Sequence, residues 1–233
     1  MEARTYTVIP HTQRWQAMAN LQMAVARGWC YWTGGILPSA KAQTLAAKLD
    51  ARFGGLIGHS LTANAADRRK KLHRPRPRML LAETRSGDIA WYLLCDRPDL
   101  PGETLADARE KRSRIHFAER YELVRVNKPR AIGGGQNWTW RYTPKVYDQH
   151  VADGCRYAAH ESPKQAQALI NFLATDPGYS GLRTQRAQLF QRMTRIRQRQ
   201  KPGRKTLQIP HLPVAVLTRL QKKPSNPIDN VTQ

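Results

Sequence analysis

The sequence predicts an α+β protein: an antiparallel sheet with packed helices, followed by a basic helical C-terminal subdomain. Short runs rich in β-branched and aromatic residues, each bounded by turn signals, dominate the middle of the chain. From Pro144 onward, apolar residues recur at the spacings of three and four that are typical of helices. The predicted organisation is a sheet-containing α+β domain over residues 1–143, a helical basic subdomain over residues 144–205 and an extended tail over residues 206–233.

The first quarter of the chain alternates between strands and helices. Residues 5–9 form a β-prone run that a proline ends, and a helix capped by Thr12 follows and stops at Gly28. Residues 29–33 predict a short aromatic strand that two glycines close. A second helix is predicted over residues 39–53, where an apolar stripe recurs with helical period.

Two hairpins are predicted in the middle of the chain. Residues 79–83 and 89–95 are apolar runs that flank a turn signal around Gly87. Residues 121–126 and 138–143 form a second pair of strand-like runs, joined by a long glycine-rich loop. These four strands are the expected antiparallel sheet.

Three further helices are predicted outside the hairpins. Thr104 and Asp107 resemble a capping box and predict a helix over residues 104–113. Residues 145–159 form a helix of the C-terminal subdomain, and residues 162–175 form the next one, which opens with serine followed by proline.

The most basic stretch, residues 182–205, carries nine arginines and lysines and no acidic residue. Leu182, Leu189, Met193 and Ile196 recur at spacings of three, four and seven, which is one face of an α-helix. This stretch is therefore predicted to be a helix that packs through an apolar seam.

Each residue of an α-helix is rotated by about 100° about the helix axis, and this rotation divides the arginines of this helix into two groups. Arg192, Arg195 and Arg199 lie away from the seam, while Arg186 and Arg197 border it. Since no carboxylate is present to pair with them, neighbouring arginines repel one another by about 0.3 kcal/mol per pair, and an external polyanion would relieve that repulsion. The nucleic-acid contacts predicted in this helix are Arg183, Arg186, Arg192, Arg195 and Arg199.

A second basic cluster covers residues 65–78. Two prolines at positions 75 and 77 prevent a helix from continuing, so its second half is expected to be an extended arm that orders on a phosphate backbone. The alternative is a solvated linker. The nucleic-acid contacts predicted here are Arg68, Arg69, Lys70, Lys71, Arg74, Arg76 and Arg78.

The strand over residues 138–143 alternates aromatic and polar side chains. Trp138, Trp140 and Tyr142 share one face of this strand. They can be stacking platforms for unpaired bases or the inner face of a sheet, and the inner face is the favoured interpretation. Arg141 points the other way and is predicted to contact phosphate.

Two histidines are the candidates for catalysis. His59 follows a glycine-rich run and His116 lies near several arginines, so either can serve as the base of a metal-free RNA cleavage. The carboxylates are scattered and the three cysteines lack zinc-finger spacing. Neither a metal site nor a cofactor is expected.

Composition points to a polyanionic partner. The 233 residues carry a formal net charge of +22 at pH 7, and such an excess usually indicates nucleic acid. No apolar run approaches the roughly 20 residues of a membrane-spanning helix. The start of the chain lacks the pattern of a secretory leader, so a cytoplasmic protein without a membrane partner is expected.

The favoured function is a non-enzymatic one: binding of DNA or RNA, alone or as a subunit of a nucleoprotein complex or of a plasmid or mobile-element system. The cluster of arginines on a late helix is similar to the basic helix of CRISPR repeat-processing endoribonucleases, which hold an RNA hairpin. That similarity covers only this helix, and the glycine-rich C-terminal loop of the family is absent. A metal-independent endoribonuclease and a basic scaffold for an acidic protein partner are the two alternatives.

Overall fold

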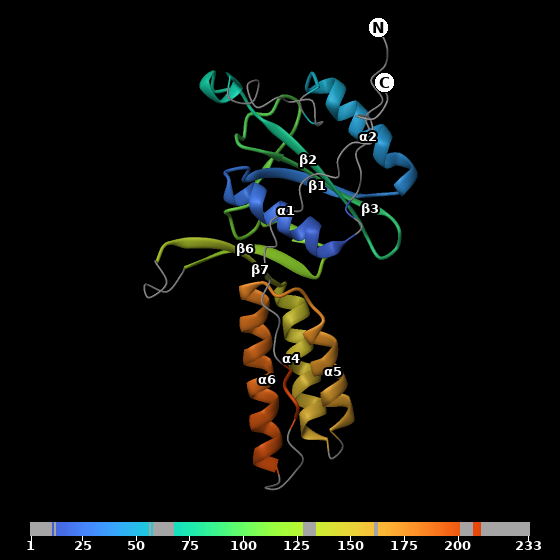
Figure 1. Cartoon of the computed structure of the whole chain (residues 1–233), viewed down its shortest axis with the longest axis vertical. Helices are drawn as coiled ribbons and strands as arrows, with labels where there is room; N and C mark the ends of the chain where they lie inside the picture. Colours follow the sequence, from blue (N-terminus) through green and yellow to red (C-terminus); the bar gives the residue numbers. More distant parts are fainter. Residues whose placement is uncertain are drawn as a thin grey trace, which may run out of the picture. The chain divides into compact units, whose positions relative to one another are not determined.

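The computed structural model describes residues 11, 13–55, 57, 68–127, 134–160, 163–200 and 207–210 (Figure 1). The chain divides into two compact units, Met1–Ala152 and Asp153–Gln233. The described residues contain helices and antiparallel sheets, which confirms the predicted α+β class. The division predicted at residue 144 falls at the start of a helix, whereas the two units divide inside that helix. None of the described helices is long and apolar enough to cross a membrane.

The larger sheet of the first unit has four antiparallel strands in the order β2-β3-β1-β4. The predicted hairpin is confirmed as β2 (Pro77–Glu83) and β3 (Ile89–Cys95), and β4 (Ala106–Asp107) is a short edge strand. β1 (Tyr31–Leu37) continues through the two glycines that were expected to end it. A Cβ atom on Gly34 would lie 2.5 Å from the Trp91 carbonyl oxygen, so the close approach of β3 requires glycine there.

The second predicted hairpin belongs to a separate sheet. β6 (Tyr121–Asn127) and β7 (Gln136–Tyr142) pair antiparallel along their whole length, and β5 (His116–Phe117) pairs with β6 on its other side. The first unit therefore contains two antiparallel sheets.

One face of the four-stranded sheet is covered by α2 (Ser39–Arg52). Ala42, Ala46 and Leu49 of this helix form one buried apolar cluster with side chains of the sheet that include Leu81 and Leu93. The small alanines let the helix approach the sheet closely, and burial of the leucines supplies the hydrophobic free energy.

The other face is joined to the three-stranded sheet by a series of aromatic contacts. Tyr92 of β3 stacks on Phe117 of β5, and Phe117 meets the ring of Trp140 edge-on at 6.2 Å. The Trp140 Nε1 donates a hydrogen bond to the Met18 carbonyl of α1 (Arg14–Ala26). Trp138, Trp140 and Tyr142 are buried, so this face of β7 is core, as favoured, and is not a stacking platform for bases.

The helix predicted over residues 104–113 is absent, and a strand and turns take its place. The backbone of Ala106–Asp107 pairs with Tyr31 and Trp32 on the edge of the sheet. The Asp107 carboxylate accepts hydrogen bonds from the backbone N–H and the guanidinium of Arg109, so it does not cap a helix. Pairing with a distant strand thus overrides the local capping signal.

The second unit is helical and contains the end of α4 (Pro144–Ala159), α5 (Lys164–Ala174) and α6 (Ser180–Gln200). Leu182, Leu189 and Met193 of α6 are buried as predicted. After α6, residues 207–210 form no strand; Gln208 exchanges backbone hydrogen bonds with the Gln167 side chain of α5.

Gly154 sets the distance between α4 and α6. It is buried, and a Cβ atom at this position would lie 2.9 Å from the Leu189 Cδ1 and 3.0 Å from the Met193 Sδ. We expect Gly154→Leu to destabilise the second unit by about 1–3 kcal/mol, because overpacking outweighs the gain in helix propensity. Thermal unfolding followed by helical circular dichroism measures the effect.

Ala152→Leu is the matched control, because Ala152 lies on the same helix and is exposed. A Gly154→Leu protein that melts no lower than this control would show that the close packing is unimportant.

Candidate nucleic-acid interface

α6 presents three arginines to solvent. Arg192, Arg195 and Arg199 are exposed, and in the described part of the chain none of them forms a salt bridge. Together with Gln188, Gln191 and Ile196 they line a shallow hollow of about 540 Å³. We call Arg192, Arg195 and Arg199 the α6 arginine face.

The spacing of this face suits a phosphate backbone. Residues at positions i, i+3 and i+7 share one side of a helix, and the first and last Cα atoms are about 10 Å apart at a rise of about 1.5 Å per residue. The two glutamines that flank the arginines are uncharged donors and acceptors of hydrogen bonds. The face therefore combines positive charge with polar groups that can contact phosphate or sugar.

Arg186 does not belong to this surface, contrary to the sequence prediction. It is fully buried, and its guanidinium donates hydrogen bonds to the backbone carbonyls of Leu173, Asp176 and Pro177. The last carbonyls of a helix lack partners within it and carry partial negative charge. Arg186 contacts the Leu173 carbonyl in the last turn of α5 and the Asp176 and Pro177 carbonyls just after that helix, so it is a structural residue.

Arg197 has the same role at the end of α4. It is buried in the seam position that was predicted for Ile196, and its Nη1 donates to the His160 carbonyl. Ile196 is only half-buried and lines the hollow beside the α6 arginine face. Arg183, another predicted contact, is also half-buried.

The basic segment that precedes β2 is partly folded. Residues 68–71 form one helical turn, and the chain then runs extended to Pro77. Arg69 folds back, with its Nε and Nη2 donating to the Pro75 carbonyl at 3.2 and 3.1 Å. The other arginines and lysines of this turn are exposed, as is Arg74, three residues after it: Arg68, Lys70, Lys71 and Arg74.

Arg76 and Arg78, the last members of the predicted arm, differ in charge environment. Arg76 forms a 2.7 Å salt bridge with Asp96 and lies 4.8 Å from the centre of the Trp29 ring, so its charge is compensated. Arg78 is exposed on β2. Desolvation by neighbouring atoms and repulsion from Arg27 lower the pKa of Arg78, which indicates crowding of positive charge.

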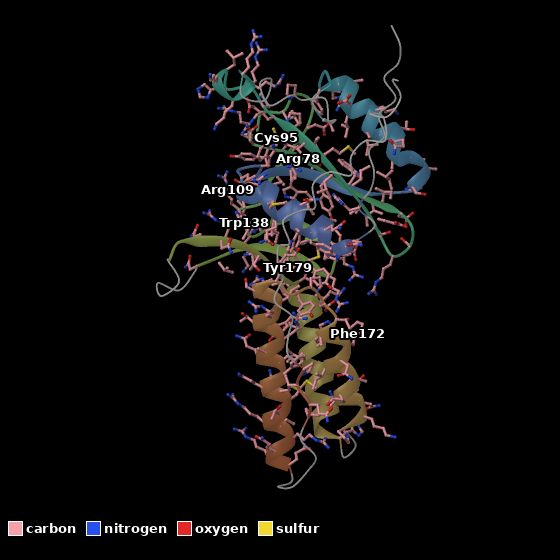
Figure 2. The ribbon with its side chains drawn as sticks, viewed as in Figure 1. Arg78, Cys95, Arg109, Trp138, Phe172 and Tyr179 are labelled. Atoms are coloured by element: carbon pink, nitrogen blue, oxygen red, sulfur yellow. The ribbon has the colours of Figure 1, made fainter. Side chains whose placement is uncertain are left out.

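Sheet register brings further cations to the same place. Pro77 lies opposite Cys95, Cys95 opposite Tyr31, and Tyr31 opposite Asp107, so these four residues mark one end of the sheet. Arg97 comes two residues after Cys95, and its Nη2 lies 2.9 Å from the His73 Nδ1. Figure 2 shows Arg78, Cys95 and Arg109 in this part of the molecule.

The cations at this end that form no salt bridge within the described residues define a second surface. Arg109 is excluded because Asp107 holds it at 2.6 Å. Sequence reasoning missed Arg27 and Arg97. Strand register places Arg97 here, just beyond the end of β3, while Arg27 at the end of α1 is close enough to Arg78 to lower its pKa. We call the following residues the sheet-end patch: Arg27, Arg68, Lys70, Lys71, Arg74, Arg78 and Arg97.

Arg141 is a weaker candidate than the sequence indicated. Its Nε donates to the buried Glu122 carboxylate at 2.6 Å, and Arg114 contacts the same carboxylate at 3.2 Å. The pairing compensates much of the charge of Arg141, although its side chain remains partly exposed.

The two histidine candidates do not form an assembled catalytic site in the described structure. His59 lies outside the described residues. His116 is exposed on β5 and lines a cavity together with Arg120. Among the residues with described positions, no group of three or more histidine, cysteine, aspartate or glutamate side chains can hold a metal ion.

Comparison of the chain with protein-family models, curated proteins and solved structures found no match. The two basic surfaces and the cavity beside His116 are therefore the features from which a function can be inferred.

The distinction between structural and exposed arginines on α6 is testable. We expect Arg186→Met to destabilise the second unit by at least about 2 kcal/mol, because three carbonyls lose a charged donor while the apolar volume is retained. Arg195→Met, on the exposed side, should change stability by less than about 0.5 kcal/mol.

Thermal unfolding followed by circular dichroism compares the two variants directly. Equal melting temperatures for Arg186→Met and Arg195→Met would contradict the structural role of Arg186.

Proposed function

We propose that this protein binds nucleic acid, with phosphates held by the α6 arginine face and by the sheet-end patch. The observation that carries the proposal is the α6 arginine face itself: three exposed arginines on one side of a helix, with no acidic partner among the described residues. Positive groups in this arrangement repel one another, and phosphate relieves that repulsion while releasing condensed counterions.

The two surfaces belong to different units, so each can hold its own stretch of DNA or RNA. This suits a subunit of a nucleoprotein assembly, in which one chain contacts more than one segment of nucleic acid. We place this activity in the cytoplasm, since Cys30, Cys95 and Cys155 are all free thiols.

The test is the salt dependence of binding. For Arg192→Ala combined with Arg195→Ala, we expect weaker binding of duplex DNA and RNA. The plot of log affinity against log salt should lose about 0.9 from its slope for each phosphate contact removed. Fluorescence anisotropy of labelled duplexes between about 50 and 200 mM salt measures both quantities.

The control removes the same number of charges from arginines that already have acidic partners. Arg52→Ala combined with Arg156→Ala meets this condition, because Arg52 pairs with Glu103 and Arg156 with Asp153. This control should keep nearly the original slope. The proposal fails for α6 if the Arg192 and Arg195 variant gives the same affinity and slope as the control.

A further inference from the structure

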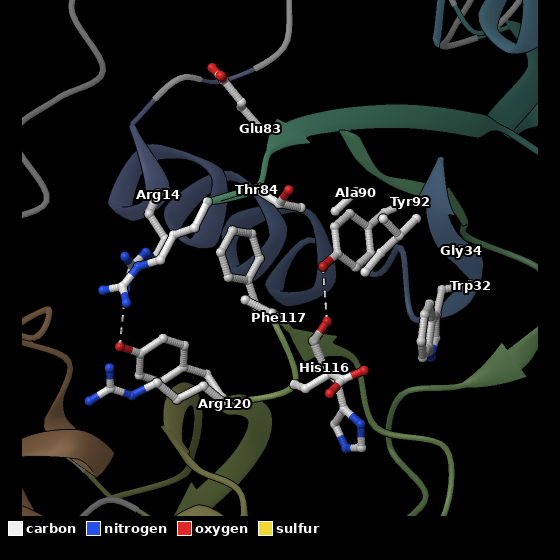
Figure 3. A pocket seen from close by; sticks show the side chains of 16 residues that line it. Arg14, Trp32, Gly34, Glu83, Thr84, Ala90, Tyr92, His116, Phe117 and Arg120 are labelled. Carbon is white, nitrogen blue, oxygen red and sulfur yellow. Dashed lines mark hydrogen bonds between the residues drawn. The ribbon is translucent and has the colours of Figure 1, made fainter. Parts of the chain in front are cut away.

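A cavity of about 500 Å³ lies in the first unit, between the four-stranded sheet and the turn that joins β5 to β6 (Figure 3). Its walls are aromatic and come from Trp32, Tyr92, Phe117 and Tyr121. The volume lies within the range of about 300–1,000 Å³ that is usual for small-molecule sites. It is separate from both basic surfaces, because none of its lining residues belongs to the α6 arginine face or to the sheet-end patch.

The aromatic walls are held in place by polar contacts. The Trp32 Nε1 donates to the Ser113 carbonyl at 2.8 Å, and the Tyr92 hydroxyl donates to the His116 carbonyl at 2.9 Å. The rings of Tyr92 and Phe117 are nearly parallel, with an interplanar angle of 9°. A ligand therefore meets rigid walls and does not need to order them on binding.

Small residues keep the cavity open. Gly34 lies opposite Tyr92 and Ile36 lies opposite Ala90, so these positions share one face of the sheet. Gly34 supplies no side chain and cannot gain one, because its Cβ would lie 2.5 Å from the Trp91 carbonyl oxygen. Ala90 adds only a methyl group. The backbone thus leaves room beside the aromatic rings.

The rim carries charge of both signs. Three arginines, Arg14, Arg85 and Arg120, line the cavity together with Glu83 and Glu119. Figure 3 shows the guanidinium groups of Arg14 and Arg120 on the same side of Phe117, and the Arg14 Nη1 lies 3.5 Å from the Tyr121 hydroxyl. Charge-assisted donors therefore stand at one end of an aromatic cavity.

We propose that this cavity binds a single nucleotide, with its base among the aromatic rings and its phosphate at Arg14 and Arg120. The inference rests on the proposed function, since it takes a nucleotide to be the ligand. Base–aromatic stacking contributes about 1–3 kcal/mol per base. The carboxylate of Glu119, which lines the cavity, can accept a hydrogen bond from an exocyclic amine of a base. The nucleotide comes either from an unpaired position in a strand or from the free pool.

The first experiment titrates the whole chain with AMP, CMP, GMP and UMP separately by isothermal calorimetry. We expect at least one of them to bind with a dissociation constant of about 0.05–1 mM, which corresponds to stacking plus one or two charge-assisted hydrogen bonds. Inorganic phosphate alone should bind at least about tenfold more weakly, because it lacks the base. Absence of binding by all four nucleotides at millimolar concentration overturns the inference, as does equal binding of inorganic phosphate.

Two variants locate the site. Ala90→Phe fills the cavity and should abolish nucleotide binding, while Arg14→Gln removes one rim charge and should weaken binding about tenfold. Since Ala90 is buried and its replacement can disturb folding, Arg14→Gln provides the independent test. Binding that is unchanged in Arg14→Gln and in a folded Ala90→Phe protein overturns the site.

The variant with Arg192→Ala and Arg195→Ala separates this inference from the proposed function. It should bind mononucleotides as the unaltered chain does, because its substitutions lie in the other unit. Loss of duplex binding in this variant without any nucleotide binding to the chain would sustain the proposed function and overturn the cavity site. If the chain binds a mononucleotide and this variant keeps the original duplex salt slope, the cavity site is sustained and the proposed function is overturned for α6.

In the same variant, a single-stranded tetranucleotide distinguishes the two sources of nucleotide. Competition with the bound mononucleotide, absent for a longer and stably paired duplex, assigns the site to unpaired positions in a strand. Lack of competition by the tetranucleotide assigns it to free nucleotides.

Discussion

The helical unit depends on two buried arginines that satisfy the carbonyl ends of neighbouring helices. Arg186 serves α5 and Arg197 serves α4. The two are eleven residues apart, which is about three turns, so both project from the same side of α6. Burial of a guanidinium costs free energy that hydrogen bonds to its Nη atoms offset here, and these contacts therefore fix the rotation of α6 about its axis. The α6 arginine face is exposed because the opposite side of the helix is fixed in this way.

The first unit depends on a comparable constraint of shape. The rings of Tyr92, Phe117 and Trp140 link one face of the four-stranded sheet to the smaller sheet, and Trp140 continues the link to α1 through its hydrogen bond. These three large rings fill the space between the two sheets. Next to them, Gly34 and Ala90 contribute almost no volume, and the cavity is the result. Its walls are thus made by the same residues that hold the unit together.

Local signals in the sequence predicted individual helices and hairpins. Contacts between distant segments determined which arginines are buried and which reach the basic surfaces. The hairpin of β2 and β3 followed from its turn and its apolar runs, and the seam of α6 followed from the spacing of Leu182, Leu189 and Met193. Arg197 and Ile196 are adjacent at the border of that seam, and only the position of the α4 carbonyls decides which is buried. Arg97 reaches the sheet-end patch through the pairing of strands far apart in sequence. No periodicity within one segment contains that information.

The formal charge of the chain is therefore a poor measure of what a polyanion meets. Several of the arginines that produce the net charge of +22 are already engaged. Arg76 and Arg109 have carboxylate partners, and Arg186 and Arg197 contact carbonyls in the interior. Counterion release on binding nucleic acid depends on the cations that reach phosphates, so these engaged residues add little to it. Among the arginines of α6, the structure thus exposes Arg192, Arg195 and Arg199 on one face, and phosphate contact by this helix has to be judged on that face.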